Sequence, residues 1–207
     1  LHHNSVYAQM SRGKTEKTVA MALASLGGTL ARLCTDICLY LGQNFGFISF
    51  PAELTTGSSI MPHKKNPDVF EILRSNVNVI VALQTQVKDI SKNLISGYNR
   101  DTQLTKEPLI KGMGIARRSL EIAALVMAKV EPNKAKLMKS LEPEFFAVHE
   151  ANRLVKSGMP FRDAYQHVKE HLHELKVGDP VKAIKEVRSI GGPGNLQLNK
   201  YKLSKPL

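Results

Sequence analysis

The chain has 207 residues, enough for one or two domains with a sizeable buried core. Aromatic residues make up only 6%, tryptophan is absent, and the first two thirds are rich in Ala, Leu and Val, a composition that favours helices over sheets. The net charge of +11 invites a nucleic-acid interpretation, but the excess is spread evenly, with +5 over residues 1–132 (15 basic, 10 acidic) and +6 over residues 133–207 (14 basic, 8 acidic). We therefore expect no nucleic-acid partner.

The first long helix is predicted from Lys14 to about Asn44, a length of about 45 Å. Its apolar residues follow helical spacing, and alanines make the other faces apolar too, which is typical of a helix buried in a large assembly. Glycine inside a helix costs roughly 1 kcal/mol, so the pair Gly27-Gly28 predicts a close approach of a neighbouring helix.

The same stretch argues against other uses. The only cysteines, Cys34 and Cys38, are four residues apart, a spacing that suits no disulfide within one helix and lacks further metal ligands. We expect two structural thiols in a reducing compartment, and a cytoplasmic protein. Arg32 and Asp36 interrupt the apolar run, so we expect no membrane span. Since the chain begins at Leu1 and not at Met, a targeting segment before Leu1 remains an open alternative.

Two more long helices are predicted, from Pro67 to about Ile95 and from about Thr102 to Val130. Turn residues at 97–101 separate them, and Glu131-Pro132-Asn133 marks a boundary. We expect a domain at 1–132 and a smaller helical domain at 133–207. The smaller domain holds predicted helices at 133–141, 143–157, 160–175 and 181–187, and residues 189–207 form a loosely structured tail.

The predicted fold class is all-α. Three long antiparallel helices cannot bury the surface that they present, so we expect them to belong to a central helical bundle completed by other subunits.

The stretch GSSIMPHKKNP at residues 57–67 is the most informative part of the sequence. It places hydroxyls and cations between a glycine and a helix start, where Asn66 suits the N-cap, Pro67 the first helical position and Asp68 the positive end of the dipole. Such a loop is suited to hold a carboxylate, and we interpret it as a catalytic anion site. The alternative is an ordinary helix cap.

A second polar cluster, from Tyr98 to Lys106, follows the far end of the second long helix. Taken alone, it is a polar turn. About 30 helical residues span some 45 Å, so the turn and the loop are not expected to share a site within one subunit. Antiparallel subunits would bring one chain's turn to another chain's loop.

The pattern Gly-Ser-Ser-x-Met-Pro-x-Lys-x-Asn resembles the signature of the aspartase/fumarase superfamily. The turn at 98–106, the segment 64–68 and the segment 158–164 resemble the argininosuccinate lyases in particular. The resemblance implies a homotetramer, active sites built from three subunits, no cofactor and no metal, with this chain as the C-terminal half. It also implies a role in arginine biosynthesis.

The implied reaction is an anti-elimination that splits argininosuccinate into arginine and fumarate. On this resemblance Ser58 is the base, and Lys64 and Asn66 bind the carboxylate and stabilise the charge that builds on it. A serine needs a stabilised alkoxide to act as a base, which gives the nearby cation and helix dipole a role. Glu71 matches a glutamate that orients a histidine of the N-terminal half, so we expect the 207 residues alone to be inactive. The alternative for Glu71 is an acid that favours the helix dipole.

Substrate binding is assigned to Tyr98, Gln103 and Lys106 by the same resemblance. Arg12 is a further candidate, although Met10-Ser11-Arg12-Gly13 departs from the Ser-Asp-Arg-Asp of many family members by a shift of about one residue. The histidines show no grouping that matches a family metal site. Two alternatives stay open: another lyase of the superfamily, such as adenylosuccinate lyase, and a non-catalytic relative of the crystallin kind.

Overall fold

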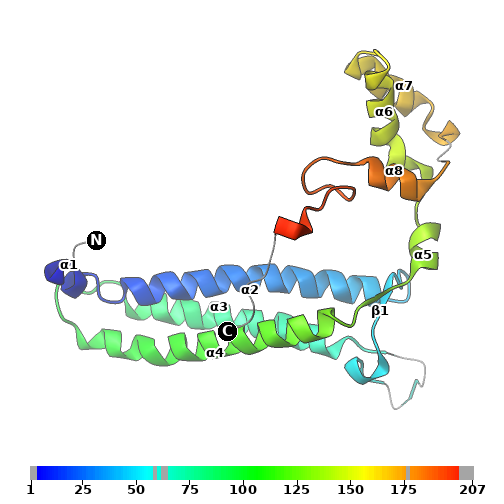
Figure 1. The fold of residues 1–207 in the computed structure, drawn as a ribbon. Coiled ribbons are helices and arrows are strands. Elements are labelled where there is room, and N and C mark those ends of the chain that lie inside the picture. Colours follow the sequence, from blue (N-terminus) through cyan, green and yellow to red (C-terminus); the bar gives the residue numbers. More distant parts are fainter. Residues whose placement is uncertain (1–3, 58–59, 62–64, 176–177, 201–207) are drawn as a thin grey trace. The chain divides into compact units, whose positions relative to one another are not determined.

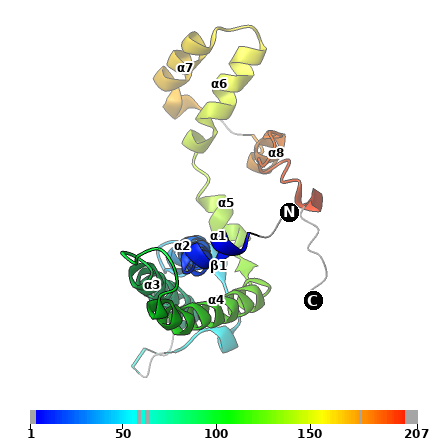
Figure 2. The ribbon, with the colours of Figure 1, turned by 90° about the vertical axis from the view of Figure 1, so that its left-hand side faces the viewer.

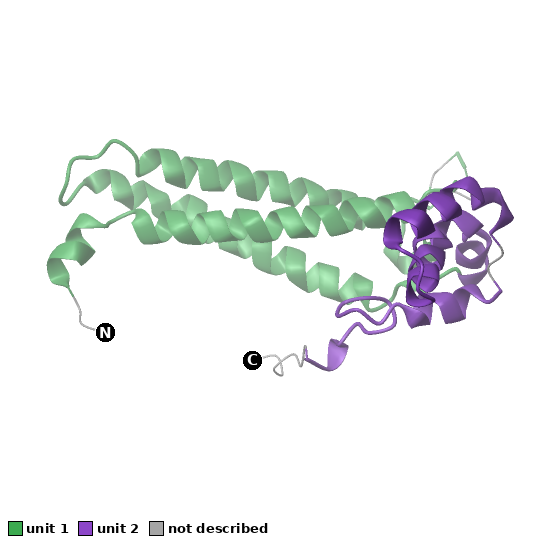
Figure 3. Cartoon of the chain, turned by 90° about the horizontal axis from the view of Figure 1, so that it is seen from above, with its two compact units in different colours: residues 1–133 green, residues 134–207 purple. Residues whose placement is uncertain are grey.

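The structure is a computed structural model, and it describes residues 4–57, 60–61, 65–175 and 178–200. It divides into two compact units, residues 1–133 and residues 134–207, coloured separately in Figure 3. Regular structure in the described residues is helical apart from one two-stranded sheet. The predicted all-α fold class is confirmed.

Three long helices build the first unit: α2 (Lys14–Leu41), α3 (Asp68–Ile90) and α4 (Lys106–Met127). They run side by side, with α3 antiparallel to α2 and α4, and each contacts the other two (Figures 1 and 2). The short helix α1 (Ser5–Met10) precedes them and was not predicted. Its start is fixed by Asn4, whose side chain accepts a hydrogen bond from the Tyr7 amide at 2.8 Å.

The hydrophobic core of this unit lies between the three helices near the end of α2. Leu73 and Val77 of α3 pack there with Cys34 of α2, and Phe50 and Phe70 meet at a ring-centroid distance of 5.1 Å. A small antiparallel sheet pairs β1 (Ile48–Ser49) with β2 (Glu131–Pro132) at the same end of the unit. A 3-10 helix, η1 (Ala52–Leu54), follows β1.

Both cysteines are free thiols, as predicted. Cys34 is buried and Cys38 half-buried, and burial raises the pKa of each thiol, with Arg74 acting in the opposite direction. A thiol with a raised pKa stays protonated, so these groups fill space in the core rather than act as nucleophiles.

The mid-helix glycines of α2 behave differently from one another. A Cβ on Gly27 would lie 3.1 Å from Cγ1 of Val77, whereas a Cβ on Gly28 would meet nothing within 4 Å. The predicted close approach is therefore confirmed for Gly27 only. By length and composition α2 could cross a membrane, and in the structure it packs on α3 and α4.

Several predicted helix boundaries are wrong. The helix α3 begins at Asp68 with Pro67 as its N-cap, and Asn66 makes no cap because its backbone pairs with Thr56 instead. The next boundary moves because residues Arg100–Thr105 form a 3-10 helix, η2, so that α4 starts at Lys106 rather than near Thr102. The helix α3 also ends at Ile90, about one turn before the predicted Ile95.

The second unit consists of short helices. They are α5 (Lys134–Lys139), η3 (Pro143–Phe146), α6 (Ala147–Lys156), α7 (Phe161–Glu170), η4 (Leu172–Glu174), α8 (Pro180–Glu186) and η5 (Leu198–Lys200). Helices α6 and α7 pack against each other, and Gly158 between them has a φ of +103°. The core of this unit is small, with Ala164 and Val168 of α7 buried among its members.

Candidate functional site

The ends of the 57–67 stretch meet at a feature that we call the loop neck, made of Thr56, Gly57, Asn66 and Asp68. Thr56 and Asn66 exchange two backbone hydrogen bonds, with N···O distances of 3.3 and 2.8 Å, and so form an antiparallel bridge. The Asn66 side chain donates to the Gly57 carbonyl at 3.4 Å, and the Thr56 hydroxyl donates to the Asp68 carboxylate. The neck thus joins both ends of the loop to the start of α3.

Two of the predicted catalytic residues, Ser58 and Lys64, lie outside the described residues. Glu71 is described, and it occupies the first turn of α3 with an exposed side chain. Burial is the main cause that raises the pKa of Cys38 in α2, and the charge of Glu71 adds to it. Asn66 and Glu71 therefore lie at the same end of the unit.

The predicted substrate-binding residues lie at the other end of α3. The Arg12 guanidinium carbon is 4.6 Å from the centroid of the Tyr98 ring, a cation–π contact. Lys106 Nζ donates to Gln103 Oε1 at 2.7 Å. Arg12 comes from the segment before α2 and the other three from the turn between α3 and α4, so this end gathers residues far apart in sequence.

The path of the chain at Arg12 depends on Gly13. Gly13 has a φ of +82°, and a Cβ on it would lie 2.9 Å from Cβ of Ser91 and 3.7 Å from Cγ2 of Thr102. Side chains other than glycine rarely adopt such a φ, so Gly13 lets the segment before α2 lie against the turn that holds Tyr98. Neither Gly13 nor Ser91 was predicted from the sequence as a site residue. The difference between Met10-Ser11-Arg12-Gly13 and the Ser-Asp-Arg-Asp of many family members was the sequence signal that could have pointed to Gly13.

The two groups of candidate residues are far apart in one chain. They lie at opposite ends of α3, whose 23 residues span about 35 Å (Figure 1). The structure therefore brings Arg12 to Tyr98 and Gln103 to Lys106, but brings none of these four to Asn66 or Glu71. This separation is the one that the sequence predicted.

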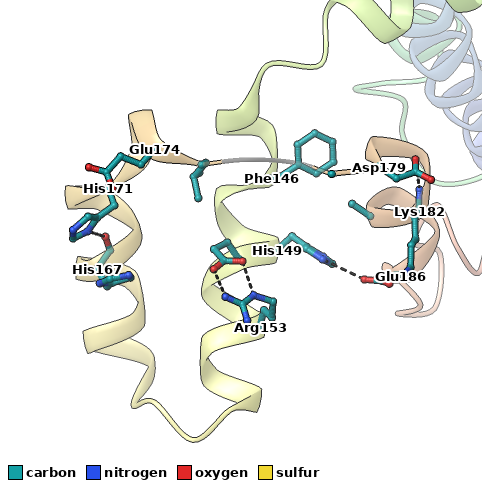
Figure 4. Close-up of a pocket in the computed structure, with 13 residues that line it drawn as sticks. Phe146, His149, Arg153, His167, His171, Glu174, Asp179, Lys182 and Glu186 are labelled. Atoms are coloured by element: carbon teal, nitrogen blue, oxygen red, sulfur yellow. Dashed lines mark hydrogen bonds and ion pairs between the residues drawn. The ribbon is translucent and has the colours of Figure 1, made fainter.

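A cavity of about 630 Å³ lies in the second unit, between α6, α7 and α8 (Figure 4). None of the predicted site residues lines it. Its walls carry charged side chains that pair with one another: Arg153 donates to both carboxylate oxygens of Glu150, at 2.7 and 2.6 Å, and His149 Nε2 lies 3.3 Å from Glu186 Oε2.

The pairing in this cavity has an electrostatic consequence. The hydrogen bond from Arg153 lowers the pKa of the Glu150 carboxyl, so Glu150 stays ionised and is neutralised by its partner. The rings of His167 and His171 stack at 4.4 Å, and His171 Nδ1 lies 2.8 Å from the His167 carbonyl. Across the described ranges of the chain, no group of three or more His, Cys, Asp or Glu side chains could hold a metal ion. The predicted site residues all belong to the first unit, so the candidate site is described there.

The sequence analysis also missed Thr56 as a site residue and gave Asp68 only a helix-dipole role. Their contact joins residues 12 positions apart through a loop whose path no periodicity specifies. A hydroxyl residue directly before Gly57 and a carboxylate directly after Pro67 were the available signals.

Comparison with known proteins matches the part of the chain that holds many of the candidate site residues. A family profile described as lyase matches residues 3–82, which include Arg12, the loop neck and Glu71. The argininosuccinate lyase of Phocaeicola vulgatus is 49% identical over 168 residues, covering 81% of this chain and 38% of that protein. That of Thermotoga neapolitana is 39% identical over 167 residues, covering 81% of this chain and 42% of that protein.

The chain is a relative of the argininosuccinate lyases. It spans about two fifths of the length of these curated relatives. Solved structures add support for the fold of this argininosuccinate lyase relative. An EDDS lyase matches with a TM-score of 0.64 at 17% identity, covering 87% of this chain and 43% of that one. A class II fumarase from Schistosoma mansoni matches with a TM-score of 0.61 at 20% identity, covering 84% and 40%.

Proposed function

We propose that this chain contributes to an argininosuccinate lyase, which splits argininosuccinate into arginine and fumarate during arginine biosynthesis. The observation that carries the proposal is the combination of the 57–67 loop and the 98–106 turn in a chain 49% identical to a curated argininosuccinate lyase. The loop supplies groups for a carboxylate, and the turn supplies polar groups for the rest of the substrate.

In the proposed reaction Ser58 removes the proton from the carbon beside a substrate carboxylate. Lys64 and Asn66 stabilise the negative charge that then builds on this carboxylate, and the N-terminus of α3 adds a favourable dipole. Glu71 orients a histidine that comes from sequence outside these 207 residues. The departing guanidinium nitrogen takes a proton from an acid that also lies outside them, so we propose that the chain alone has no turnover.

The proposed substrate contacts lie at the other end of α3. Tyr98, Gln103 and Lys106 bind the arginine and succinate portions, and Arg12 offers guanidinium donors to a carboxylate. The face of its guanidinium lies over the Tyr98 ring, and the N–H groups at the guanidinium edge are the donors that we propose for the substrate.

We also propose a homotetramer with active sites shared between subunits. One chain keeps its two groups of site residues about 35 Å apart, so a second chain must supply the missing group. The long helices expose large apolar side chains, among them Ile72, Ile110 and Leu125, which are 61%, 69% and 60% exposed. An apolar groove of about 320 Å³ lies between α2 and α4. Such surfaces are typical of subunit contacts. We place the assembly in the cytoplasm, with no nucleic-acid or membrane partner.

The test is fumarate release by the whole protein to which the chain belongs, offered argininosuccinate and adenylosuccinate separately. We expect release from argininosuccinate only, and its loss in Ser58→Ala. The matched control is Ser75→Ala, which removes an exposed serine from α3 outside the site. Release from adenylosuccinate would point to another lyase of the superfamily, and release from neither would favour a non-catalytic relative.

The assembly is tested separately by light scattering. A mass of four chains is expected for the whole protein, and a monomer would contradict the shared site. Mixing the 207-residue chain with argininosuccinate should release no fumarate, and measurable release would contradict the assignment of the acid to other sequence.

A further inference from the structure

We propose that Thr56 and Asp68 are positioning residues for the lyase reaction, holding the loop that carries Ser58 and Lys64 in register with α3. This inference rests on the proposed function. It concerns residues to which neither the family resemblance nor the sequence analysis gave a role in the reaction.

The loop neck gathers three kinds of hydrogen bond around one point. The backbone bridge between Thr56 and Asn66 closes the segment 57–65, and the Asn66 side chain adds a bond to Gly57. The hydroxyl of Thr56 then donates to the carboxylate of Asp68. This last bond links Thr56, on the incoming side of the loop, to the start of α3 through side chains.

Asp68 is anchored because the helix that it begins is anchored. Phe70 and Leu73 in the first turns of α3 are 2% and 1% exposed and belong to the hydrophobic core. The backbone bonds of that turn run from the Phe70 and Glu71 amides to the Pro67 carbonyl, at 2.9 and 3.2 Å. A group that is hydrogen-bonded to Asp68 is therefore held in a fixed position relative to the core of the unit.

The hydroxyl–carboxylate bond matters because the bridge is small. A single antiparallel bridge without neighbouring strand pairs is marginal in water. A hydrogen bond to an ionised carboxylate is roughly twice as strong as a neutral one, so the bond from Thr56 is the strongest individual contact at the neck. Its loss lets the two ends of the loop separate more often.

The expected consequence is on the chemical step. A base must lie within a fraction of an ångström of its productive position, so a neck that opens more often reduces the time during which Ser58 is correctly placed. We expect kcat of Thr56→Val to fall about threefold to tenfold, in line with the loss of one hydrogen bond. The KM for argininosuccinate should change less, because the predicted contacts at the 98–106 turn are untouched.

The chain provides a close control. Thr55 precedes Thr56 directly, and its hydroxyl bonds to the Ala52 carbonyl, at 3.3 Å. Thr55→Val therefore makes the same chemical change one residue away without touching the neck. Thr56→Ser keeps the hydroxyl and should restore kcat to within about twofold of the wild type.

The first measurement needs no activity. Amide hydrogen exchange of the whole protein, followed by mass spectrometry over residues 55–70, reports opening of the neck through the bonded amides of Thr56 and Asn66. We expect faster exchange in Thr56→Val and wild-type exchange in Thr55→Val. In the double variant Thr56→Val/Asp68→Ala exchange should be no faster than in Asp68→Ala, because both changes remove the same bond.

The second measurement is kcat and KM of the same variants in the whole protein. Faster exchange together with a lower kcat, restored by Thr56→Ser, supports the inference. Unchanged exchange in Thr56→Val overturns it whatever the activity, and unchanged kcat in an active protein overturns the positioning role. If the wild-type protein releases no fumarate, the proposed function fails, and the exchange result still decides whether the two residues hold the neck.

Discussion

The two ends of α3 are organised by different interactions. At its N-terminal end, the loop neck is held by a backbone bridge and by side-chain hydrogen bonds within the neck. At its C-terminal end, Arg12 and Tyr98 meet by stacking, and Gly13 allows the two chain segments to lie together. The neck is thus local in sequence, whereas the turn end joins residues that are 86 positions apart.

The difference has a functional meaning. By sequence, the neck end carries the hydroxyls and cations of the 57–67 loop, and the turn end carries the proposed substrate-binding residues Arg12, Tyr98, Gln103 and Lys106. Each end holds half of what the proposed reaction needs. In the proposed homotetramer, unlike ends from different subunits supply both halves, and the length of α3 is the reason that we propose an intermolecular site.

The largest expected effect is at the neck end. Phe70→Ala removes a ring that is 2% exposed and packs on Phe50, and we expect the free energy of unfolding to fall by about 3–5 kcal/mol. Urea denaturation followed by circular dichroism at a fixed chain concentration measures this. Phe45→Ala, at a ring that is 39% exposed, should cost less than half as much. Equal costs would show that the core does not extend under the neck.

The next effect distinguishes the turn end. Gly13→Ala introduces a Cβ that would lie 2.9 Å from Ser91, at a φ of +82°, and we expect it to cost about 1–3 kcal/mol of unfolding free energy. Gly28→Ala in the middle of α2 meets open space and should instead stabilise by about 0.5–1 kcal/mol. Thermal unfolding of the two variants should therefore shift in opposite directions. A stabilised Gly13→Ala would mean that the segment before α2 is not held against the turn.

A smaller effect concerns the contact of Arg12 with Tyr98. A double-mutant cycle with Arg12→Gln and Tyr98→Leu should give a coupling free energy of about 0.5–1 kcal/mol, as expected for an exposed cation–π pair. Tyr98→Phe keeps the ring and should keep the coupling with Arg12. Zero coupling would leave the turn end without a contact specific to Arg12.

The smallest effects come from one exposed ion pair at each end. The Glu53 pKa is lowered by its own backbone hydrogen bond and then by Lys129, and the Asp89 pKa is lowered chiefly by the hydrogen bond from Lys92. A carboxyl whose pKa is lowered by folding stabilises the folded state at pH values above its ordinary, unfolded pKa. This stabilisation is lost as the pH falls through the lowered pKa. Lys129→Met and Lys92→Met should therefore unfold slightly more easily than wild type at pH 7, with no difference in strong acid.

These two pairs also separate the ends. Lys129 and Glu53 are 76 residues apart, whereas Lys92 and Asp89 lie within one turn, so Lys129→Met should have the larger effect on the unfolding midpoint. Both differences should shrink as salt is added. The reverse order would show that the pair at the neck end does not tie η1 to the end of α4.

Much of the first unit could be predicted because its helices carry regular apolar periodicity. The helix α2 begins at Lys14 as predicted, and Gly27 packs closely on α3. The ends of helices were less predictable, because local hydrogen bonds decide them. The hydroxyl of Ser91 bonds back to the Val87 carbonyl at 2.8 Å, and Asn93 then adopts a φ of +60°, which stops α3 before Ile95.

The candidate site was predictable in its residue types more than in its contacts. The separation of the loop from the turn followed from helix length alone, and it appears in the structure. The bond between Thr56 and Asp68 and the approach of Gly13 to Ser91 depend on where the chain turns back on itself. Periodicity carries no information about such returns, so neither contact was foreseen.

The tight contact of Gly27 with Val77 has a consequence for how this sequence can change over evolutionary time. A Cβ gained at position 27 would stand 3.1 Å from Val77, so Val77 must shift by a few tenths of an ångström or lose volume. Gly27→Ala should therefore be tolerated better beside Val77→Ala than alone. Among functional variants of this chain, we therefore expect the side-chain sizes at positions 27 and 77 to be correlated.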